Sequence, residues 1–171
     1  DGAVRWVCGD CDAHASGGLG FGPRSIGAKC HFRDAPSLGI IARLFPPSGT
    51  GAQRSHATTG DVRFAADINL GEKWALNPNI GVASQDDGAG HFTAGLAALT
   101  LQYNISDRAN VFVDGASQSP EERGGGASLV LDAGTAWIVG SNTQFDISAG
   151  WRARGAKPPN LFLAAGISRR F

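Results

Sequence analysis

Three histidines lie in or beside segments rich in serine and aspartate, the residue types from which a hydrolytic site is built. These histidines are His14, His56 and His91, and their candidate partners are Ser16, Ser48, Ser55, Asp86 and Asp87. Serine catalysis needs a nucleophile, a base and an orienting carboxylate close together. No Gly-x-Ser-x-Gly motif occurs, and the spacings are those expected by chance in Ser- and Asp-rich loops. We therefore expect solvated loop residues and no enzyme.

The cysteines offer a second kind of chemistry. Two residues separate Cys8 from Cys11, a spacing found in disulfide, redox and zinc sites. A haem attachment site needs His after the second cysteine, where Asp12 stands, and zinc needs two more ligands although only His14 is near. We expect a Cys8–Cys11 disulfide or inert thiols, no metal, no other cofactor and no partner for Cys30.

Composition and charge limit the functional class. The chain has 171 residues, with 15 Lys and Arg against 15 Asp and Glu, and its formal net charge is zero. This length suits one domain, 1–171, and the absence of a basic stripe argues against nucleic acid. No apolar run approaches the roughly 18 residues of a transmembrane helix. Methionine is absent, so we expect that the initiator and a signal peptide have been removed.

Period-two alternation recurs along the chain and predicts ten strands. They are expected at 3–8, 22–33, 37–46, 61–71, 74–84, 91–105, 109–117, 126–139, 143–153 and 161–171. The connections after even-numbered strands are short, at 34–36, 72–73, 106–108 and 140–142. Those after odd-numbered strands are longer, for example 47–60, 85–90, 118–125 and 154–160. This pattern predicts an all-β, antiparallel, transmembrane up-and-down β-barrel with short periplasmic turns and long extracellular loops.

One face of each expected strand is apolar and the other is small or polar. In 143–153, for example, Phe145, Ile147 and Trp151 alternate with Asp146 and Arg152. An outward apolar band flanked by aromatic belts suits a bilayer of the bacterial outer membrane. The expected interface aromatics are Phe64, Trp74, Tyr103, Trp137, Trp151 and the final residue, Phe171. The alternative is a soluble β-sandwich or lipocalin-like barrel with the apolar face as its core.

The opposite face is expected to line the lumen. Its charged members are Lys29, His31, Arg43, Arg63, Asp67, Asp114, Asp132, Asp146 and Arg152. A barrel of about ten strands is only slightly wider than its side chains, and unpaired charges are costly there. We expect a salt-bridge network that plugs the lumen. The alternative is a narrow pore in which Arg43, Arg63 and Arg152 attract or gate anions.

Residues 1–17 form an atypical first strand and loop, so closure of the barrel through the short first strand is expected to be weak. Weakly paired edges can be covered by a second chain. The small residues Ala94, Gly95, Ala97 and Ala98 could also permit close packing. Besides outer-membrane lipid, the expected partners are therefore another protein or a second copy of the chain.

From about residue 18 onward the chain resembles a known family. The similarity lies in Gly-Leu-Gly-Phe-Gly-Pro-Arg-Ser-Ile-Gly-Ala-Lys (18–29), Pro-Pro-Ser-Gly (46–49), Tyr-Asn-Ile-Ser-Asp-Arg (103–108) and the closing stretch 132–171. It resembles the outer-membrane family named for the meta-pathway of phenol degradation, often called transporter-like. Arg169 departs from this pattern, because the family usually has an aromatic there.

The resemblance implies an outer-membrane barrel and says little about a substrate. We expect a structural or narrow-pore protein with a mostly side-chain-filled polar lumen. The alternative is a channel or transporter for small aromatic or anionic solutes. An outer-membrane hydrolase and a soluble binding protein are weaker alternatives.

Overall fold

The computed structural model describes residues 4–8, 24–34, 36–50, 55–155 and 160–169, with backbone only for 4–8. The regular elements in these ranges are strands: β1 (Val4–Cys8), β2 (Ile26–Asp34), β3 (Ser37–Phe45), β4 (Thr59–Leu70), β5 (Trp74–Asp86), β6 (His91–Ser106), β7 (Ala109–Ser119), β8 (Ser128–Val139), β9 (Thr143–Arg154) and β10 (Leu161–Arg169). Among the described residues, no helix is long and apolar enough to cross a membrane.

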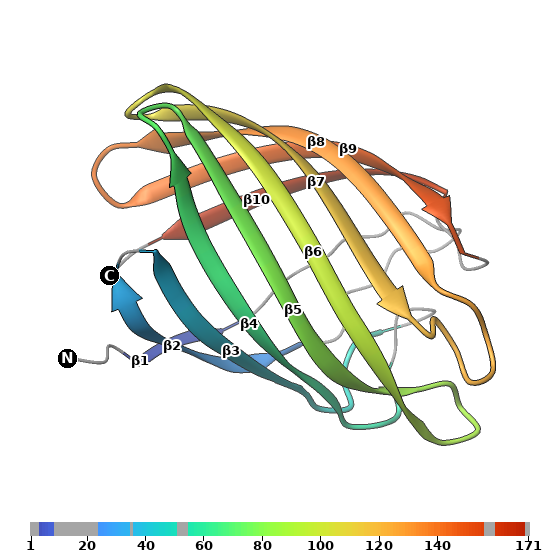
Figure 1. The fold of residues 1–171 in the computed structure, drawn as a ribbon. Coiled ribbons are helices and arrows are strands. Elements are labelled where there is room, and N and C mark those ends of the chain that lie inside the picture. Colours follow the sequence, from blue (N-terminus) through green and yellow to red (C-terminus); the bar gives the residue numbers. More distant parts are fainter. Residues whose placement is uncertain (1–3, 9–23, 35, 51–54, 156–159, 170–171) are drawn as a thin grey trace.

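The strands form one sheet in sequence order, β1 to β10, and each strand pairs antiparallel with the next (Figure 1). The predicted all-β, antiparallel, up-and-down architecture is therefore confirmed. Within the described ranges the ladders run from β1 to β10, and none of them joins β10 back to β1.

The connections alternate between the two ends of the sheet. One end, the turn end, carries the tight turns after β4, β6 and β8, in which Gly71 and Gly140 adopt positive φ angles of 87° and 69°. The other end, the loop end, carries the longer connections. The connection after β5 is shorter than expected, with residues 87–90 in place of 85–90, but it is still longer than the turns after β4, β6 and β8. Asp86 and Asp87 close this turn by accepting hydrogen bonds from the backbone N–H groups of Gly88 and Ala89.

The sheet is strongly curled, so that strands far apart in its order face one another across an interior (Figure 1). Arg63 from β4 and Arg152 from β9 line the same cavity although four strands separate β4 from β9. We call the side that bounds this cavity the concave face and the opposite side the outer face.

Burial in this fold is the reverse of that in a soluble domain. Among the described residues, the buried hydrophobic ones are three alanines, Ala83, Ala94 and Ala136, and no large side chain is fully buried. Large apolar side chains stand on the outer face, with Ile80 65% exposed and Phe64 56% exposed. A soluble protein rarely exposes apolar surface in large contiguous patches. The described apolar face is thus a surface, and the structure gives it no second sheet to pack against.

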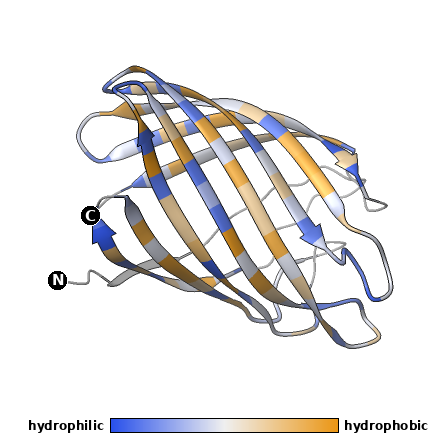
Figure 2. Cartoon of the chain, viewed as in Figure 1, coloured by the Kyte–Doolittle hydropathy of each residue, from blue (hydrophilic) through white to orange (hydrophobic). Residues whose placement is uncertain are grey.

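Figure 2 shows hydrophobic and hydrophilic residues alternating along the strands. Glycines on the concave face make room for the larger side chains there. A Cβ atom at Gly150 would come within 2.5 Å of the ring of Phe162 and would collide with Asp132 on the adjacent strand. The interior is therefore filled by a few inward side chains that rest on glycine backbone.

Candidate functional site on the concave face

The loop end of the concave face holds two arginines on one carboxylate. Asp61, the third residue of β4, has a side chain only 4% exposed. Nη2 of Arg43 on β3 lies 2.7 Å from Oδ2 of Asp61, and Nη2 of Arg63 lies 3.2 Å from the same atom. The register explains the contact, because Arg43 is the direct cross-strand partner of Asp61 and Arg63 follows it on the same face. One buried carboxylate therefore fixes two arginines.

The third loop-end arginine has a partner from a connection rather than from a strand. Nη1 of Arg152 lies 2.5 Å from Oε1 of Glu121, and both side chains are mostly buried. The segment between β7 and β8 folds back on itself through backbone hydrogen bonds from Glu121 to Gly126 and from Gly125 to Glu122. This fold carries the Glu121 carboxylate to the sheet.

Asp61 and Glu121 were not among the residues singled out from the sequence. Asp61 could have been found, since residues 61 and 63 share a face of one strand. Glu121 carries no such signal because its position depends on the path of a loop. The three arginines that the alternative hypothesis assigned to an anion-attracting cluster are paired with these two carboxylates, in the manner of the expected salt-bridge network.

Midway along the concave face, the register brings five polar side chains into one row across β4 to β8. This middle row consists of Asp67, Asn77, Thr100, Asp114 and Asp132. Asn77 Nδ2 donates to Asp67 Oδ1 at 2.7 Å, and the Thr100 hydroxyl donates to Asp114 Oδ1. Asp114 and Asp132 are direct cross-strand partners, and Oδ1 of Asp132 is buried without a hydrogen-bond partner.

The expected pairing of opposite charges fails in this row. Within the described ranges, no ion pair involves Asp67, Asp114, Asp132 or Asp146. The reason is the register, which sets Asn, Thr and Gly opposite these carboxylates and brings no basic residue to their level. The acidic and basic groups are therefore separated along the strands.

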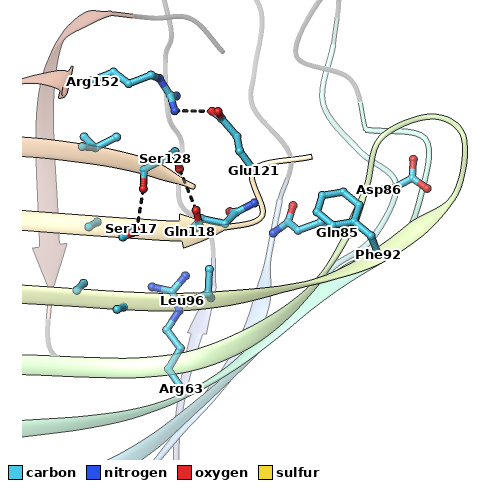
Figure 3. A pocket seen from close by; sticks show the side chains of 14 residues that line it. Arg63, Gln85, Asp86, Phe92, Leu96, Ser117, Gln118, Glu121, Ser128 and Arg152 are labelled. Atoms are coloured by element: carbon cyan, nitrogen blue, oxygen red, sulfur yellow. Dashed lines mark hydrogen bonds and ion pairs between the residues drawn. The ribbon is translucent and has the colours of Figure 1, made fainter. Parts of the chain in front are cut away.

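Two cavities open on the concave face, one toward each end. The loop-end cavity has a volume of about 400 Å³ and is lined by Arg63, Arg152, Phe92 and Leu96 among others (Figure 3). The turn-end cavity has a volume of about 450 Å³ and is lined by polar groups on β6 to β9 and by Phe112. The two cavities share no lining residue.

The remaining lumen candidates lie toward β2. Lys29 is exposed and stands opposite Ile41 in the register. His31 Nε2 lies 3.6 Å from Oδ1 of Asp34, near the end of the same strand. Neither side chain lines the loop-end or the turn-end cavity.

Those aromatic side chains named from the sequence that the structure describes stand on the outer face. Trp74 and Tyr103 are cross-strand partners at the turn end, with ring centroids 4.9 Å apart, and Trp137 pairs with Phe145 in the same region. Trp151 is half exposed near the loop end of β9. Phe64 differs from the expectation, because β4 begins at Thr59 and places it in mid-strand.

Several expected features fall outside the described residues. Four whole residues lie outside them: Cys11, His14, Ser16 and Phe171. The side chain of Cys8 lies outside them too. Cys30 is described, exposed and not part of a disulfide. No cluster of three or more metal-ligating side chains occurs within the described ranges.

The described hydrolase candidates have structural partners. The hydroxyls of Ser48 and Ser55 donate to the carbonyls of Pro46 and Ala57, and Asp86 and Asp87 close the β5–β6 turn. Within the described ranges, no hydrogen bond joins one of these groups to a histidine side chain. The polar groups are used to shape loops.

The small-residue stretch on β6 is divided between the two faces. Ala94 is completely buried and Ala98 is half-buried, whereas Gly95 and Ala97 are exposed. The alternation of the strand therefore leaves only half of the stretch on the outer face.

Comparison with known proteins identifies a family for the chain. No curated protein and no solved structure matches the chain significantly. A family profile matches residues 8–171, which is nearly the whole chain. The chain belongs to the family described as "Putative MetA-pathway of phenol degradation".

Proposed function

We propose that the chain is a β-barrel of the bacterial outer membrane, of a structural or narrow-pore type, with no enzymatic activity. The observation that carries this proposal is the reversal of burial. Large apolar side chains cover the outer face, whereas the buried polar and charged groups, Asp61 and Glu121 among them, belong to the interior. Lipid is the environment in which this arrangement is favourable.

Strand lengths and aromatic positions support insertion. The six strands β4 to β9 are 11 to 16 residues long, enough for the roughly 9–11 residues that a tilted membrane strand needs. Trp74 and Tyr103 would lie at the periplasmic interface, where amphipathic rings are favoured. Lys73 Nζ lies 5.9 Å from the Tyr103 ring centroid, so its charge would reach the headgroups.

The filled interior supports a structural or narrow-pore role over that of an open porin. Arg43, Arg63 and Asp61 occupy the loop end, and the rings of Phe112 and Phe162 lie over glycines on neighbouring strands. A barrel of about ten strands leaves little space beyond its own side chains. Such an interior would resist the free flow of solutes.

A second function, the passage of small solutes, is favoured by the two cavities. They lie toward opposite ends of the concave face, with the middle row near the boundary between them. A solute would pass only if the side chains of Asp114, Asp132 and their neighbours moved aside. Channel activity on this account is small and sensitive to the charge of these groups.

Outer-membrane extraction followed by electrophoresis of boiled and unboiled samples tests the first proposal. A folded barrel migrates differently when it is not boiled, so two positions are expected. A protein that stays in the soluble fraction and migrates identically in both samples would overturn the proposal. In planar bilayers we expect either no conductance or a small one that changes on Arg63→Gln or Asp132→Asn; large open-channel steps would refute the filled interior.

A further inference from the structure

We propose that the loop-end cavity binds a small carboxylate that carries an apolar body. This inference rests on the proposed barrel, whose loops would open this cavity to the outside. Two arginines face this cavity, an apolar wall lies beside them and further charged groups surround it.

The first observation concerns unused hydrogen-bond donors. Arg63 meets Asp61 through Nη2, and Arg152 meets Glu121 through Nη1. The Nε–H group of each arginine is buried and has no hydrogen-bond partner in the described part of the chain. A buried donor without an acceptor is unfavourable, and a carboxylate oxygen is a strong acceptor for a guanidinium.

The second observation is that the two arginines, on β4 and β9, line one cavity from different sides. Figure 3 shows Arg63 rising from β4 and Arg152 projecting from β9 toward the same cavity. Their partner carboxylates hold each guanidinium in place before any ligand enters. Such preorganisation lowers the entropic cost of binding.

The third observation is the apolar wall. Phe92 and Leu96 from β6 and Val130 from β8 line the cavity beside the arginines (Figure 3). A cavity of about 400 Å³ with mixed apolar and polar lining lies within the usual range for small-molecule sites. A fully hydrated inorganic anion would make no use of this wall.

The charged groups are placed unevenly around the cavity. Arg43, Arg63 and Arg152 face Asp61 and Glu121. A further carboxylate, Asp86, belongs to the same cavity, but it accepts the Gly88 N–H and lies at the β5–β6 turn away from both arginines (Figure 3). A carboxylate held on the arginine side of the cavity would lie away from Asp86.

Benzoate is a suitable probe, because benzamide is its neutral isostere and acetate is its counterpart without the ring. We expect calorimetric titration of the detergent-folded protein to show saturable benzoate binding, at least about tenfold weaker binding of benzamide, and weaker binding of acetate. Absence of benzoate binding, or equal affinity for benzamide, overturns the inference. Loss of heat-modifiability in the same preparation would instead refute the barrel.

Variants locate the site. Arg152→Lys keeps a cation for Glu121 but removes the Nε donor, and it is expected to weaken benzoate binding about tenfold. Phe92→Ala is expected to weaken benzoate binding more than acetate binding. The matched control is Arg123→Gln, which removes an arginine that pairs with Asp87 and does not line this cavity. If Arg123→Gln weakens binding as much as Arg152→Lys, the assignment to this cavity is wrong.

Discussion

Arg43 and Asp61 are direct cross-strand partners on β3 and β4, and their side chains meet at 2.7 Å on the concave face. Asp61 is almost completely buried and also accepts from Arg63. Two strands are thereby joined by an ion pair in addition to their backbone ladder. The same pair neutralises charge at the loop end, so it links the stability of the fold to the electrostatics of the cavity.

Removing the Asp61 carboxylate should destabilise the protein strongly. Asp61→Asn leaves two arginines without their shared anion, and breaking a buried pair costs about 3–5 kcal/mol. Because each arginine is 27% exposed, we expect the lower end, about 3 kcal/mol, in denaturant unfolding from detergent micelles. Asp34→Asn is the control, since that side chain is 96% exposed. Equal effects of the two substitutions would contradict the role of Asp61.

Removing the Asp132 carboxylate should stabilise the protein. Asp132 stands directly across from Asp114, and like charges opposite each other in a sheet are destabilising. Its Oδ1 atom is also buried without a hydrogen-bond partner. Asp132→Asn is expected to raise the free energy of unfolding by roughly 0.5–1 kcal/mol. A loss of stability in the same denaturant titration would show that the carboxylate has a stabilising partner.

Gly150 tests the packing of the interior. Gly150→Val would place a side chain against Asp132 and the Phe162 ring, and overpacking of this kind costs about 1–3 kcal/mol. Gly126→Ala is the matched control, because a Cβ atom there meets nothing within 4 Å. The midpoint of urea unfolding should fall for the first variant alone. An unchanged midpoint for Gly150→Val would mean that the interior has spare room.

The Asp87–Arg123 pair links two loops outside the strands and predicts a pH effect. Burial acts to raise the pKa of the Asp87 carboxyl, but the Ala89 N–H and the Arg123 guanidinium outweigh it and lower the pKa. The stabilising contribution is therefore present above the unfolded pKa of about 3.9 and is lost as pH falls through the lower folded value. In Arg123→Gln the Asp87 pKa should rise in an NMR titration; an unchanged value would exclude the pair as its cause.

The sequence predicted the strands well because alternation and turn chemistry are local signals. The expected strand 143–153 is Thr143–Arg154 in the structure, and the residues of 109–117 fall within Ala109–Ser119. The turn end was nearly as clear: the expected connection 140–142 is found as such, and the expected 72–73 is extended by Gly71, which was expected in the strand.

The concave face was only partly predictable. Parity places Arg63 and Asp67 on one face, but the partner of each depends on the register between strands, which a single strand does not specify. The sequence therefore suggested general charge pairing, whereas the register separates the arginines from the middle row. Glu121 reaches Arg152 through the fold of a loop, for which alternation gives no information.

The most direct test of the central claim asks which face of the sheet meets lipid. In a chain with Trp6, Trp74 and Trp151 replaced by Phe, Trp137 is the only tryptophan and stands on the outer face. In the matched variant Trp137 is also replaced, and Phe112→Trp supplies a tryptophan on the concave face. In vesicles with brominated acyl chains, we expect strong quenching of Trp137 and weak quenching at position 112. Equal quenching at both positions, or none at Trp137, would contradict the membrane barrel.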